Sequence, residues 1–292
     1  MTLTLNPERL TRRYHETGDL NPRTVAAFQK AIYAHFRANP RPMPWRETRD
    51  PYCILVSEIM LQQTQVERVK VKYAQFLDCF PTPAELAAAP LPDVLRVWQG
   101  LGYNRRAIAL KRCAGEIMDR LSGRFPSATE ELLSLPGIGP YTARAVAAFA
   151  FNRAEAFIET NIRTVFIHFF FHGRDRVADR EIMPLVAATI DSAAPREWYY
   201  ALMDYGVLLK ERHPNPSRRS AHHSRQSPFK GSNRELRSRM LRALMEQPGL
   251  TARDLAERLA SEPAALERNL DALQQEGFLE RRGEGYVISG GN

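Results

Sequence analysis

The sequence predicts an all-α protein that ends in a small module of three helices and one β-hairpin. Apolar residues recur at helical spacing through most of residues 24–209, and no alternating strand pattern occurs before residue 278. The chain has 292 residues, of which 44% are hydrophobic. It is therefore long enough to bury a sizeable core and to form one large domain with a smaller one.

About ten short helices are expected in the large domain. In the first of them, Val25, Phe28, Ile32 and Phe36 form one apolar stripe. Pro or Gly lies at most of the boundaries between helices, as expected of residues that interrupt helical structure. The expected helices cover residues 24–38, 54–61, 66–80, 83–89, 92–98, 105–121, 129–135, 141–151, 162–171, 180–190 and 196–209.

The composition changes after residue 209, which we take as the end of the large domain, 1–209. Residues 210–239 hold nine Lys or Arg and two Glu, and so supply nearly all of the formal net charge of +8. Because the stretch is also rich in Pro, Ser, His and Asn, we expect a linker or surface strap over residues 210–232. Its cations either contact phosphates or are simply solvated, and we interpret His222 and His223 as surface residues.

Helical periodicity resumes in the third part, residues 233–292. Thr251 and Asp254 have the spacing of a capping box, and two short strand-like runs, 278–280 and 286–288, predict a hairpin. The expected helices cover residues 235–246, 252–260 and 263–276. This order is typical of a winged helix-turn-helix module, which usually docks on DNA through its third helix. That helix is not markedly basic here, so protein–protein contact or dimerisation stays open.

The overall charge favours a polyanionic partner. Of the 41 basic residues, 35 are Arg, whose planar fork suits phosphate, although an Arg-rich solvated surface gives the same count. Cys53, Cys79 and Cys113 are scattered and predict no disulfide framework, zinc site or iron–sulfur site. No segment approaches the run of about 18 apolar residues that spans a bilayer, and the amino-terminal residues lack an apolar leader. We therefore expect a cytoplasmic protein without membrane contact.

Residues 129–151 predict a helical hairpin around a tight turn, Leu135-Pro136-Gly137-Ile138-Gly139. The two glycines leave the turn without side chains, so backbone N–H groups at the next helix N-terminus can meet a phosphate closely. Thr142, in the first turn of that helix, is a further candidate DNA contact. A generic hairpin of two helices is the other interpretation.

Four blocks of sequence resemble the helix-hairpin-helix DNA glycosylase superfamily (HhH-GPD), and within it the MutY adenine glycosylase branch. They are Pro-Trp-Arg-Glu-Thr-Arg-Asp-Pro-Tyr, Ser-Glu-Ile-Met-Leu-Gln-Gln-Thr-Gln-Val, Trp-Gln-Gly-Leu-Gly-Tyr and Leu-Pro-Gly-Ile-Gly-Pro-Tyr-Thr-Ala, in that order. The resemblance covers about residues 25–210. It implies base flipping and hydrolytic removal of a base during base excision repair, on double-stranded DNA that holds a mismatch or lesion.

The resemblance assigns roles to individual residues. Glu58 matches the glutamate that protonates the departing purine; it is a lone carboxylate on an apolar helix, where burial should raise its pKa, unless it lies at the helix edge. Gln62 and Gln63 match amides that enter the duplex, and Tyr103 matches an aromatic that intercalates beside the partner base. Tyr141 stands where bifunctional relatives carry a Schiff-base lysine, so the resemblance implies a monofunctional enzyme.

The sequence departs from the family at a position after the hairpin. Glu159 stands where the family has an aspartate, while Asn161, two residues later, is preserved. A glutamate still supplies a carboxylate to stabilise a sugar cation, although its extra methylene changes the geometry. Either Glu159 performs this role or the chemistry has changed. Since Glu is a weak helix N-cap, we expect Thr160 to cap the following helix.

Two further departures concern the part after the Met203–Gly206 helix. Relatives carry four cysteines there, and this chain has none, so we expect no iron–sulfur cluster; a monovalent cation at the hairpin is the one cofactor left open. The basic strap would bind phosphates in place of the cluster loop, through Arg218, Arg219 and Arg225. The Nudix-like domain that reads 8-oxoguanine in MutY enzymes is also missing.

The resulting hypothesis is a monofunctional, monomeric DNA N-glycosylase that excises an adenine from a mispair. Two alternatives remain open. One is a thymine/uracil mismatch glycosylase, because that branch also carries a tyrosine in the hairpin. The other is a DNA-binding protein without catalysis, for which the missing aspartate and the added winged helix would be the signature.

Overall fold

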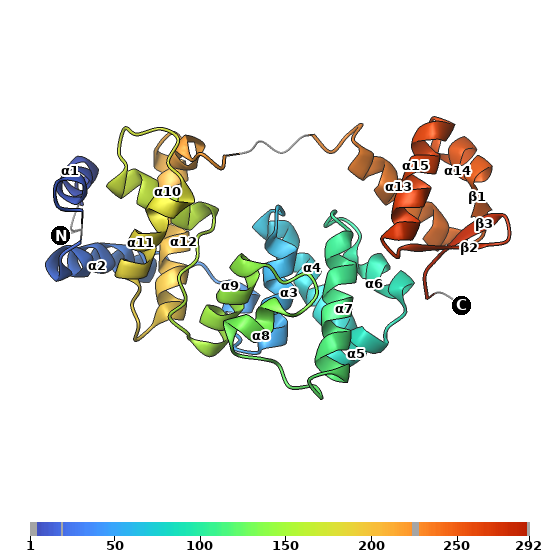
Figure 1. Ribbon diagram of the computed structural model, residues 1–292, viewed down its shortest axis with the longest axis horizontal. Helices are drawn as coiled ribbons and strands as arrows, with labels where there is room; N and C mark the ends of the chain where they lie inside the picture. The colour runs from blue at the N-terminus through green and yellow to red at the C-terminus, as the bar shows by residue number, and fades with distance from the viewer. Residues whose placement is uncertain (1–4, 19, 224–227, 291–292) are drawn as a thin grey trace. The chain divides into compact units, whose positions relative to one another are not determined.

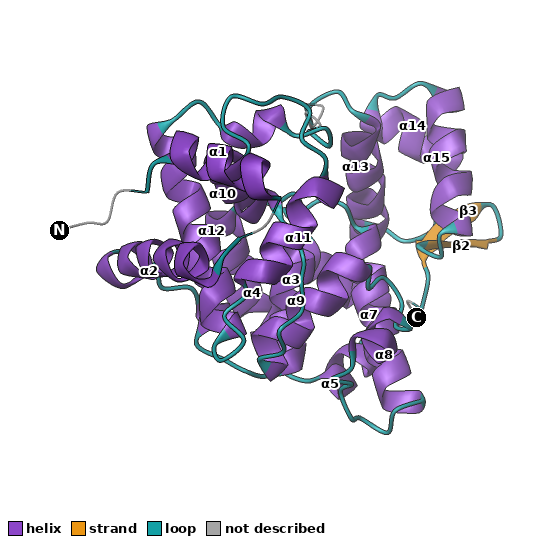
Figure 2. Ribbon diagram, turned by 60° about the vertical axis from the view of Figure 1, so that its left-hand side comes forward, coloured by secondary structure: helices purple, strands orange, loops and turns teal. Residues whose placement is uncertain are grey.

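The computed structural model describes residues 5–18, 20–223 and 228–290. Helices make up almost all of its regular structure, and the strands lie near the C-terminus (Figures 1 and 2), so the predicted fold class is confirmed. The elements are α1 (Pro7–Thr17), α2 (Pro22–Ala38), η1 (Pro44–Arg46), α3 (Pro51–Leu61), α4 (Val66–Cys79), α5 (Pro83–Ala88), α6 (Leu91–Trp98), α7 (Arg105–Asp119), α8 (Thr129–Leu133), α9 (Pro140–Phe151), α10 (Thr160–Phe170), α11 (Asp179–Thr189), α12 (Pro195–Arg212), η2 (Pro216–Arg219), α13 (Asn233–Glu246), β1 (Leu250–Thr251), α14 (Ala252–Leu259), α15 (Pro263–Gln275), β2 (Leu279–Arg282) and β3 (Gly285–Ile288).

Helix α1 is the element that the sequence pattern missed. None of its residues is buried, so it has no apolar stripe to detect. It is defined instead by its ends: the Asn6 side chain accepts a hydrogen bond from the N–H of Arg9 at 3.0 Å, and Gly18 ends the helix with φ 68°. The ring of Tyr14 lies against Phe170 and Phe171 and so docks the helix.

The chain forms two units, neither of which is continuous in sequence. The first unit contains residues 1–54, 127–133 and 138–225, and the second contains residues 55–126, 134–137 and 226–292. The boundary between residues 54 and 55 falls inside α3. The sequence-based limits at 209 and 232 divide the chain by composition rather than by contacts, and they stay a prediction.

The core of the first unit is an aromatic cluster around Phe28 on α2. Its ring meets those of Phe166, Phe169 and Phe170 on α10, and that of Trp198 on α12, with centroids 5.3 to 5.9 Å apart. Most of these pairs are edge-to-face, the arrangement that aromatic quadrupoles favour. This packing fixes α10 against α12, which matters because both helices carry candidate site residues.

The second unit combines α4 to α7 with the C-terminal module. Phe76 on α4 packs against Trp98 on α6 with ring centroids 5.8 Å apart, and both side chains are fully buried. In the module, α13 to α15 adjoin a three-stranded antiparallel sheet of order β1-β3-β2, in which Leu250 pairs with Tyr286 and Leu279 with Ile288. The predicted winged helix is confirmed, with β1 added to the expected hairpin.

The predicted capping box at Thr251 is formed. The Thr251 hydroxyl accepts from the N–H of Asp254 at 3.2 Å, and the Asp254 carboxylate accepts from the N–H of Thr251 at 2.9 Å. These bonds satisfy backbone donors that α14 cannot pair internally. Among the described residues, no helix has the length and apolar character needed to cross a membrane.

Candidate functional site

The tight turn between α8 and α9 is built so that a glycine is required at one position. Gly137 has φ 76°, and a Cβ there would lie 2.5 Å from the Cβ of Ala109 on α7. Leu135 and Ile138 are buried and anchor the turn, whereas Gly137 and Gly139 are exposed. The turn therefore presents backbone rather than side chains to solvent, as a phosphate contact requires.

Residue Thr142, predicted as a DNA contact, is buried in the first turn of α9, with 2% of its surface exposed. Tyr141 is half-buried, and its ring meets that of Phe157 edge-on at 5.7 Å. Phe157 in turn stacks on Tyr199 at 4.0 Å. Tyr141 is thus positioned by an aromatic stack within the first unit.

The carboxyl group of Glu58 belongs to the most buried stretch of α3. Glu58 itself is 6% exposed, and its neighbours Ser57 and Ile59 are equally enclosed. The alternative interpretation, a glutamate at the helix edge with its carboxylate in water, does not fit this burial. A carboxyl group in such surroundings is suited to hold a proton and to donate it.

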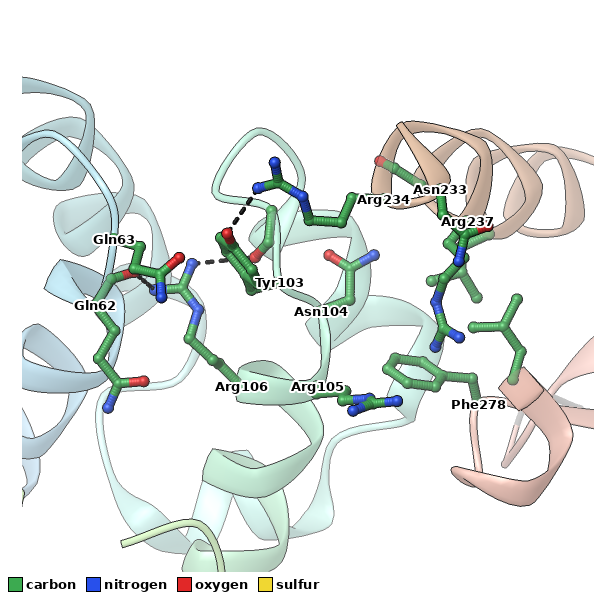
Figure 3. Close-up of a pocket in the computed structure, with 14 residues that line it drawn as sticks. Gln62, Gln63, Tyr103, Asn104, Arg105, Arg106, Asn233, Arg234, Arg237 and Phe278 are labelled. Carbon is green, nitrogen blue, oxygen red and sulfur yellow. Dashed lines mark hydrogen bonds between the residues drawn. The ribbon is translucent and has the colours of Figure 1, made fainter. Parts of the chain in front are cut away.

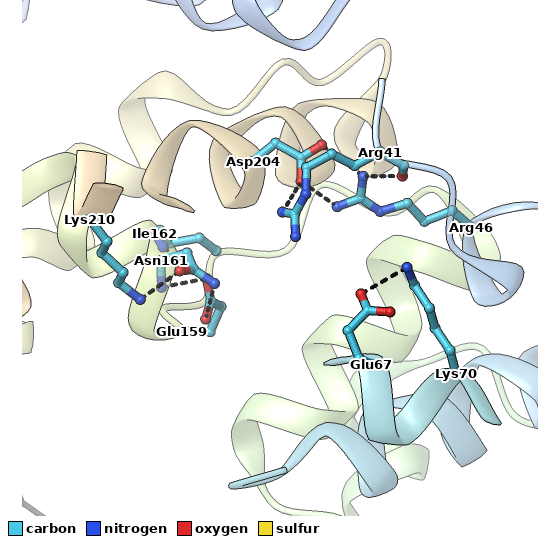
Figure 4. A network of polar contacts seen from close by, with 9 residues as sticks. All are labelled: Arg41, Arg46, Glu67, Lys70, Glu159, Asn161, Ile162, Asp204 and Lys210. Atoms are coloured by element: carbon cyan, nitrogen blue, oxygen red, sulfur yellow. Dashed lines mark hydrogen bonds and ion pairs between the residues drawn. The ribbon is translucent and has the colours of Figure 1, made fainter. Parts of the chain in front are cut away.

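Glu159 is the N-cap of α10, which corrects the expectation that Thr160 would cap it. The Glu159 carboxylate accepts from the N–H groups of Asn161 at 2.6 Å and Ile162 at 2.9 Å, while Thr160 is the first residue of the helix and is exposed (Figure 4). The extra methylene lets the side chain reach back to both donors. Burial raises the pKa of Glu159, and these two bonds oppose the rise.

Asn161 is held from the other side by a lysine that the sequence analysis missed. The Lys210 ammonium, near the end of α12, donates to Asn161 Oδ1 at 2.6 Å (Figure 4). Burial lowers the pKa of Lys210, and the nearby Glu159 carboxylate opposes that shift. The helices approach closely because of Gly206, where a Cβ would lie 2.4 Å from the carbonyl oxygen of Asn161.

The same segment of α12 carries a buried carboxylate, Asp204. It is 1% exposed and accepts a bidentate pair of hydrogen bonds from Arg46 and a third bond from Arg41, all at 2.8 Å (Figure 4). Such paired bonds compensate the carboxylate for its lost hydration. Asp204 therefore fastens the stretch before α3 to α12 within the first unit.

The predicted DNA-entering residues lie on two loops of the second unit, and Arg106 holds both loops. The Arg106 guanidinium, buried on α7, donates to the carbonyl of Gln62 at 2.6 Å and to that of Gly102 at 3.1 Å (Figure 3). It also donates to the carbonyls of Ile59, Met60 and Leu101 and to the Thr64 hydroxyl. Burial lowers its pKa to about 10, so it remains a cation at neutral pH.

Both loops contain a residue in a conformation that non-glycine residues rarely adopt. Gln63 has φ 55° and Tyr103 has φ 47°. Left-handed backbone at such residues costs free energy and persists only where the surroundings impose it. Arg106 supplies that constraint, because it binds carbonyls directly beside both residues. No sequence signal pointed to Arg106, whose partners on the first loop lie more than 40 positions away.

The basic strap is partly built into the first unit. The carbonyl of Arg219 accepts from the N–H of Val177 at 2.9 Å, and its guanidinium donates to the carbonyl of Phe171 at 3.2 Å. Burial lowers the pKa of Arg219. Arg218 is exposed and remains available to a phosphate. Arg225, the third predicted contact, lies outside the described residues.

The chain does not fit an iron–sulfur cluster held by four cysteines, since it has three cysteines in all. Within the described residues, no three His, Cys, Asp or Glu side chains are grouped so that they could hold a metal ion. The expectation of a cluster-free protein, and the open question of a cation at the hairpin, remain predictions.

A family model described as "HhH-GPD superfamily base excision DNA repair protein" matches residues 56–187. An adenine DNA glycosylase of Mycolicibacterium smegmatis is 34% identical over 278 residues, which cover 88% of this chain and 94% of that protein. The chain belongs to the HhH-GPD superfamily. Within it the chain falls in the MutY-like branch, as the sequence blocks predicted. The model of the MarR family matches residues 233–286, in the winged-helix module of this HhH-GPD protein.

Other HhH-GPD proteins match the first two-thirds of the chain. An adenine DNA glycosylase of Buchnera aphidicola is 35% identical over 193 residues, 64% of this chain and 54% of that protein, so the chain spans about half of its length. The solved structure of a thermostable thymine-DNA glycosylase superposes with a TM-score of 0.58 and 26% identity, covering 65% of this chain and 89% of that one. These relatives extend the similarity to enzymes described as acting on two different bases.

Proposed function

We propose that this protein is a monofunctional DNA N-glycosylase of base excision repair that removes adenine from a mispair. The observation that carries the proposal is the buried carboxyl group of Glu58 on α3, within the segment that matches the HhH-GPD family. The relative that matches over 94% of its own length is described as an adenine DNA glycosylase, which favours adenine as the target.

The chemistry divides into leaving-group and sugar steps. Protonation of the flipped adenine by Glu58 lets the bond between its ring nitrogen and C1′ break with the electron pair going to the base. The sugar then carries positive charge, which the anionic Glu159 carboxylate stabilises. Water adds to C1′ and its proton returns to Glu58, which leaves an abasic site and restores the enzyme.

The substrate would be double-stranded DNA, gripped at a phosphate by the exposed backbone of the Gly137–Gly139 turn and by Arg218. Gln62, Gln63 and Tyr103 would open the stack, and their rigid loops suit that task. Tyr141 stands without a lysine in the hairpin, and the Lys210 amine serves as a hydrogen-bond donor to Asn161, so no covalent step is proposed. We further propose that the protein acts as a monomer, which light scattering would test.

The test uses duplexes that contain adenine opposite guanine, cytosine or 8-oxoguanine, and thymine or uracil opposite guanine. After incubation with the protein, alkali breaks the strand at any abasic site. We expect a break at adenine and no adduct trapped by borohydride. A break at thymine or uracil would instead favour the second branch, and no break in any duplex would favour a DNA-binding protein without catalysis.

Two variants assign the acid within this assay. Glu58→Gln keeps the shape of the side chain but cannot donate the proton, so we expect loss of cleavage with DNA binding retained. The matched control is Glu67→Gln, on the exposed face of α4, where Glu67 pairs with Lys70 at 3.0 Å (Figure 4). Full activity in Glu58→Gln would reject the assignment.

A further inference from the structure

Two adjoining cavities lie along α13 in the second unit, and no catalytic role given above uses them. The first, of about 420 Å³, lies between α13 and the loop that carries Tyr103 (Figure 3). The second, of about 550 Å³, lies between α13, residues 63–68 and residues 100–103. Tyr103 and Arg234 form part of the wall of both. The Arg234 guanidinium donates to the Tyr103 hydroxyl at 2.7 Å and covers the ring at 5.0 Å.

The second cavity is strongly basic. Four arginines line it against a single carboxylate, that of Glu235. Arg68 and Arg242 are exposed, so their guanidinium groups can meet a ligand from solvent. Arg239 is already bound to the carbonyl of Leu259 at 2.8 Å and is less available. A concave surface with this excess of positive charge attracts a polyanion, and paired guanidinium forks suit phosphate.

An exposed aromatic ring lies in the same cavity. Phe229 lines it and is 50% exposed, one of the few large apolar side chains on the described surface. An aromatic ring beside arginines is the combination that binds single-stranded nucleic acid, because a base stacks on the ring while the cations hold the backbone. A duplex, whose bases are stacked on each other, would leave this ring unused.

The first cavity has a different lining, which suits a base. The amides of Gln62, Gln63, Asn104 and Asn233 offer both donors and acceptors, and Leu241, Leu273 and Phe278 supply apolar surface. Its cations are largely engaged: Glu276 accepts from Arg105 at 2.7 Å and from Arg237 at 2.6 Å, and Arg106 holds loop carbonyls. A flat ring with a polar edge complements such a lining.

We propose that this α13 groove binds an unpaired stretch of DNA, with phosphates at Arg68 and Arg242, one base on Phe229 and another in the first cavity. The inference rests on the proposed function for its source of DNA, since opening a duplex beside Gln63 and Tyr103 creates unpaired nucleotides. The DNA-facing helix of the module is then α13 rather than α15. The Leu266–Asp271 part of α15 carries one Arg against two carboxylates, whereas α13 carries four Arg.

Binding to single strands tests the groove directly. The probe is a fluorescent oligothymidylate with the full-length protein, read by anisotropy over a range of salt. Phe229→Ala should weaken binding about tenfold through lost stacking. The pair Arg68→Ala and Arg242→Ala, combined, should reduce the salt dependence of log K by about 1.4, which is roughly 0.7 for each phosphate lost. Val71→Ala and Arg253→Ala, at exposed sites on α4 and α14, should match the wild type.

Photocrosslinking locates the strand. A duplex with a mispaired adenine carries 4-thiothymidine in either strand, and crosslinked peptides are identified by mass spectrometry. Peptides that contain Phe229 or Tyr103 support the groove, and the reactive strand names the source of the nucleotides. Crosslinks confined to α15, or unchanged affinity and salt dependence in the groove variants, would overturn the proposal, as they would if this face instead bound a protein.

The two proposals fail separately. A protein that cleaves at adenine while its groove variants bind like the wild type lacks the groove but remains a glycosylase. A protein whose single-strand binding depends on Phe229 and Arg242, yet which cleaves no duplex, keeps the groove and loses the proposed activity.

Discussion

Lys210 reaches the first turn of α10 from another helix, one turn beyond the Gly206 position that lets the two helices approach. Its ammonium fixes the Asn161 amide and lies close enough to lower the pKa of Glu159. We regard Lys210 as a positioning residue, since it acts through these two side chains. Its charge also helps to keep Glu159 in the anionic form that the sugar cation requires.

Replacing Lys210 should therefore change the pH dependence of cleavage. In Lys210→Met the pKa of Glu159 rises, because a positive charge that favoured the carboxylate is gone. As the pH falls, Glu159 then becomes protonated at a higher pH than in the wild type, and activity is lost there. Single-turnover rates measured across pH should show the acidic limb displaced upward. Lys30→Met, at an exposed site on α2, is the control, and a uniformly slower but undisplaced profile would indicate a purely structural role.

At this scale the sequence was informative where a residue type occupies a family position and silent where a contact is distant. Glu58 and Glu159 were identified from their positions in the chain. Arg106 and Lys210 were not, because each has a partner more than 40 residues away and no local pattern encodes such a contact. The capping of α10 by Glu159 was mispredicted because average cap preferences do not consider what a longer side chain can reach.

The hairpin between α8 and α9 shows how one element depends on its neighbour. Gly137 needs a left-handed backbone and lies against Ala109 of α7. Gly139 has an ordinary φ of −89°, and a Cβ added there would meet no atom within 4 Å. The two glycines of the turn therefore serve different purposes. Only the first is demanded by packing within the fold.

We expect Gly137→Ala to lower the free energy of unfolding by about 2–4 kcal/mol, from left-handed strain together with overpacking. Gly139→Ala should change it by less than about 1 kcal/mol, because nothing opposes the added methyl group. Thermal and urea denaturation of both variants, followed by circular dichroism, would measure the difference. Equal melting temperatures for the two variants would show that the close contact with Ala109 is relieved at little cost.

Most elements were predictable because burial imposes a period on the sequence. Helices from α2 to α12 each have an apolar face, and their predicted limits lie within a few residues of the observed ones. Helix α1 and strand β1 could not be found in this way. The first has no buried residue, and the second has two residues and is defined by its pairing with β3 rather than by its own composition.

For the whole molecule, Glu276 is the contact that ties the winged-helix module to α7. Its carboxylate is bound by Arg105 of α7 and Arg237 of α13, and Arg112 donates to its carbonyl oxygen at 3.2 Å. The side chain is 18% exposed, so these charge-assisted bonds are partly shielded from water. The walls of the α13 groove depend on this attachment.

Removing the Glu276 charge should loosen the module. In Glu276→Gln, hydrogen exchange across residues 233–290 should become faster, by about tenfold for a lost interaction worth on the order of 1–2 kcal/mol. Exchange in α4 and α6 should stay as in the wild type. Glu257→Gln, which removes an exposed pair with Arg253 on α14, provides the control. Unchanged exchange in Glu276→Gln would mean that apolar packing alone holds the module.

Families of sequences divide this chain near residue 232, yet the walls of both cavities come from the two sides of that division. Arg234, Arg242 and Phe278 belong to the MarR-like part, and Arg68 and Tyr103 belong to the glycosylase-like part. The module is consequently not an exchangeable cassette. Transplanted onto another glycosylase, or expressed by itself, it would carry half of a binding surface, and a negative result with either fragment would say nothing about the joined gene product.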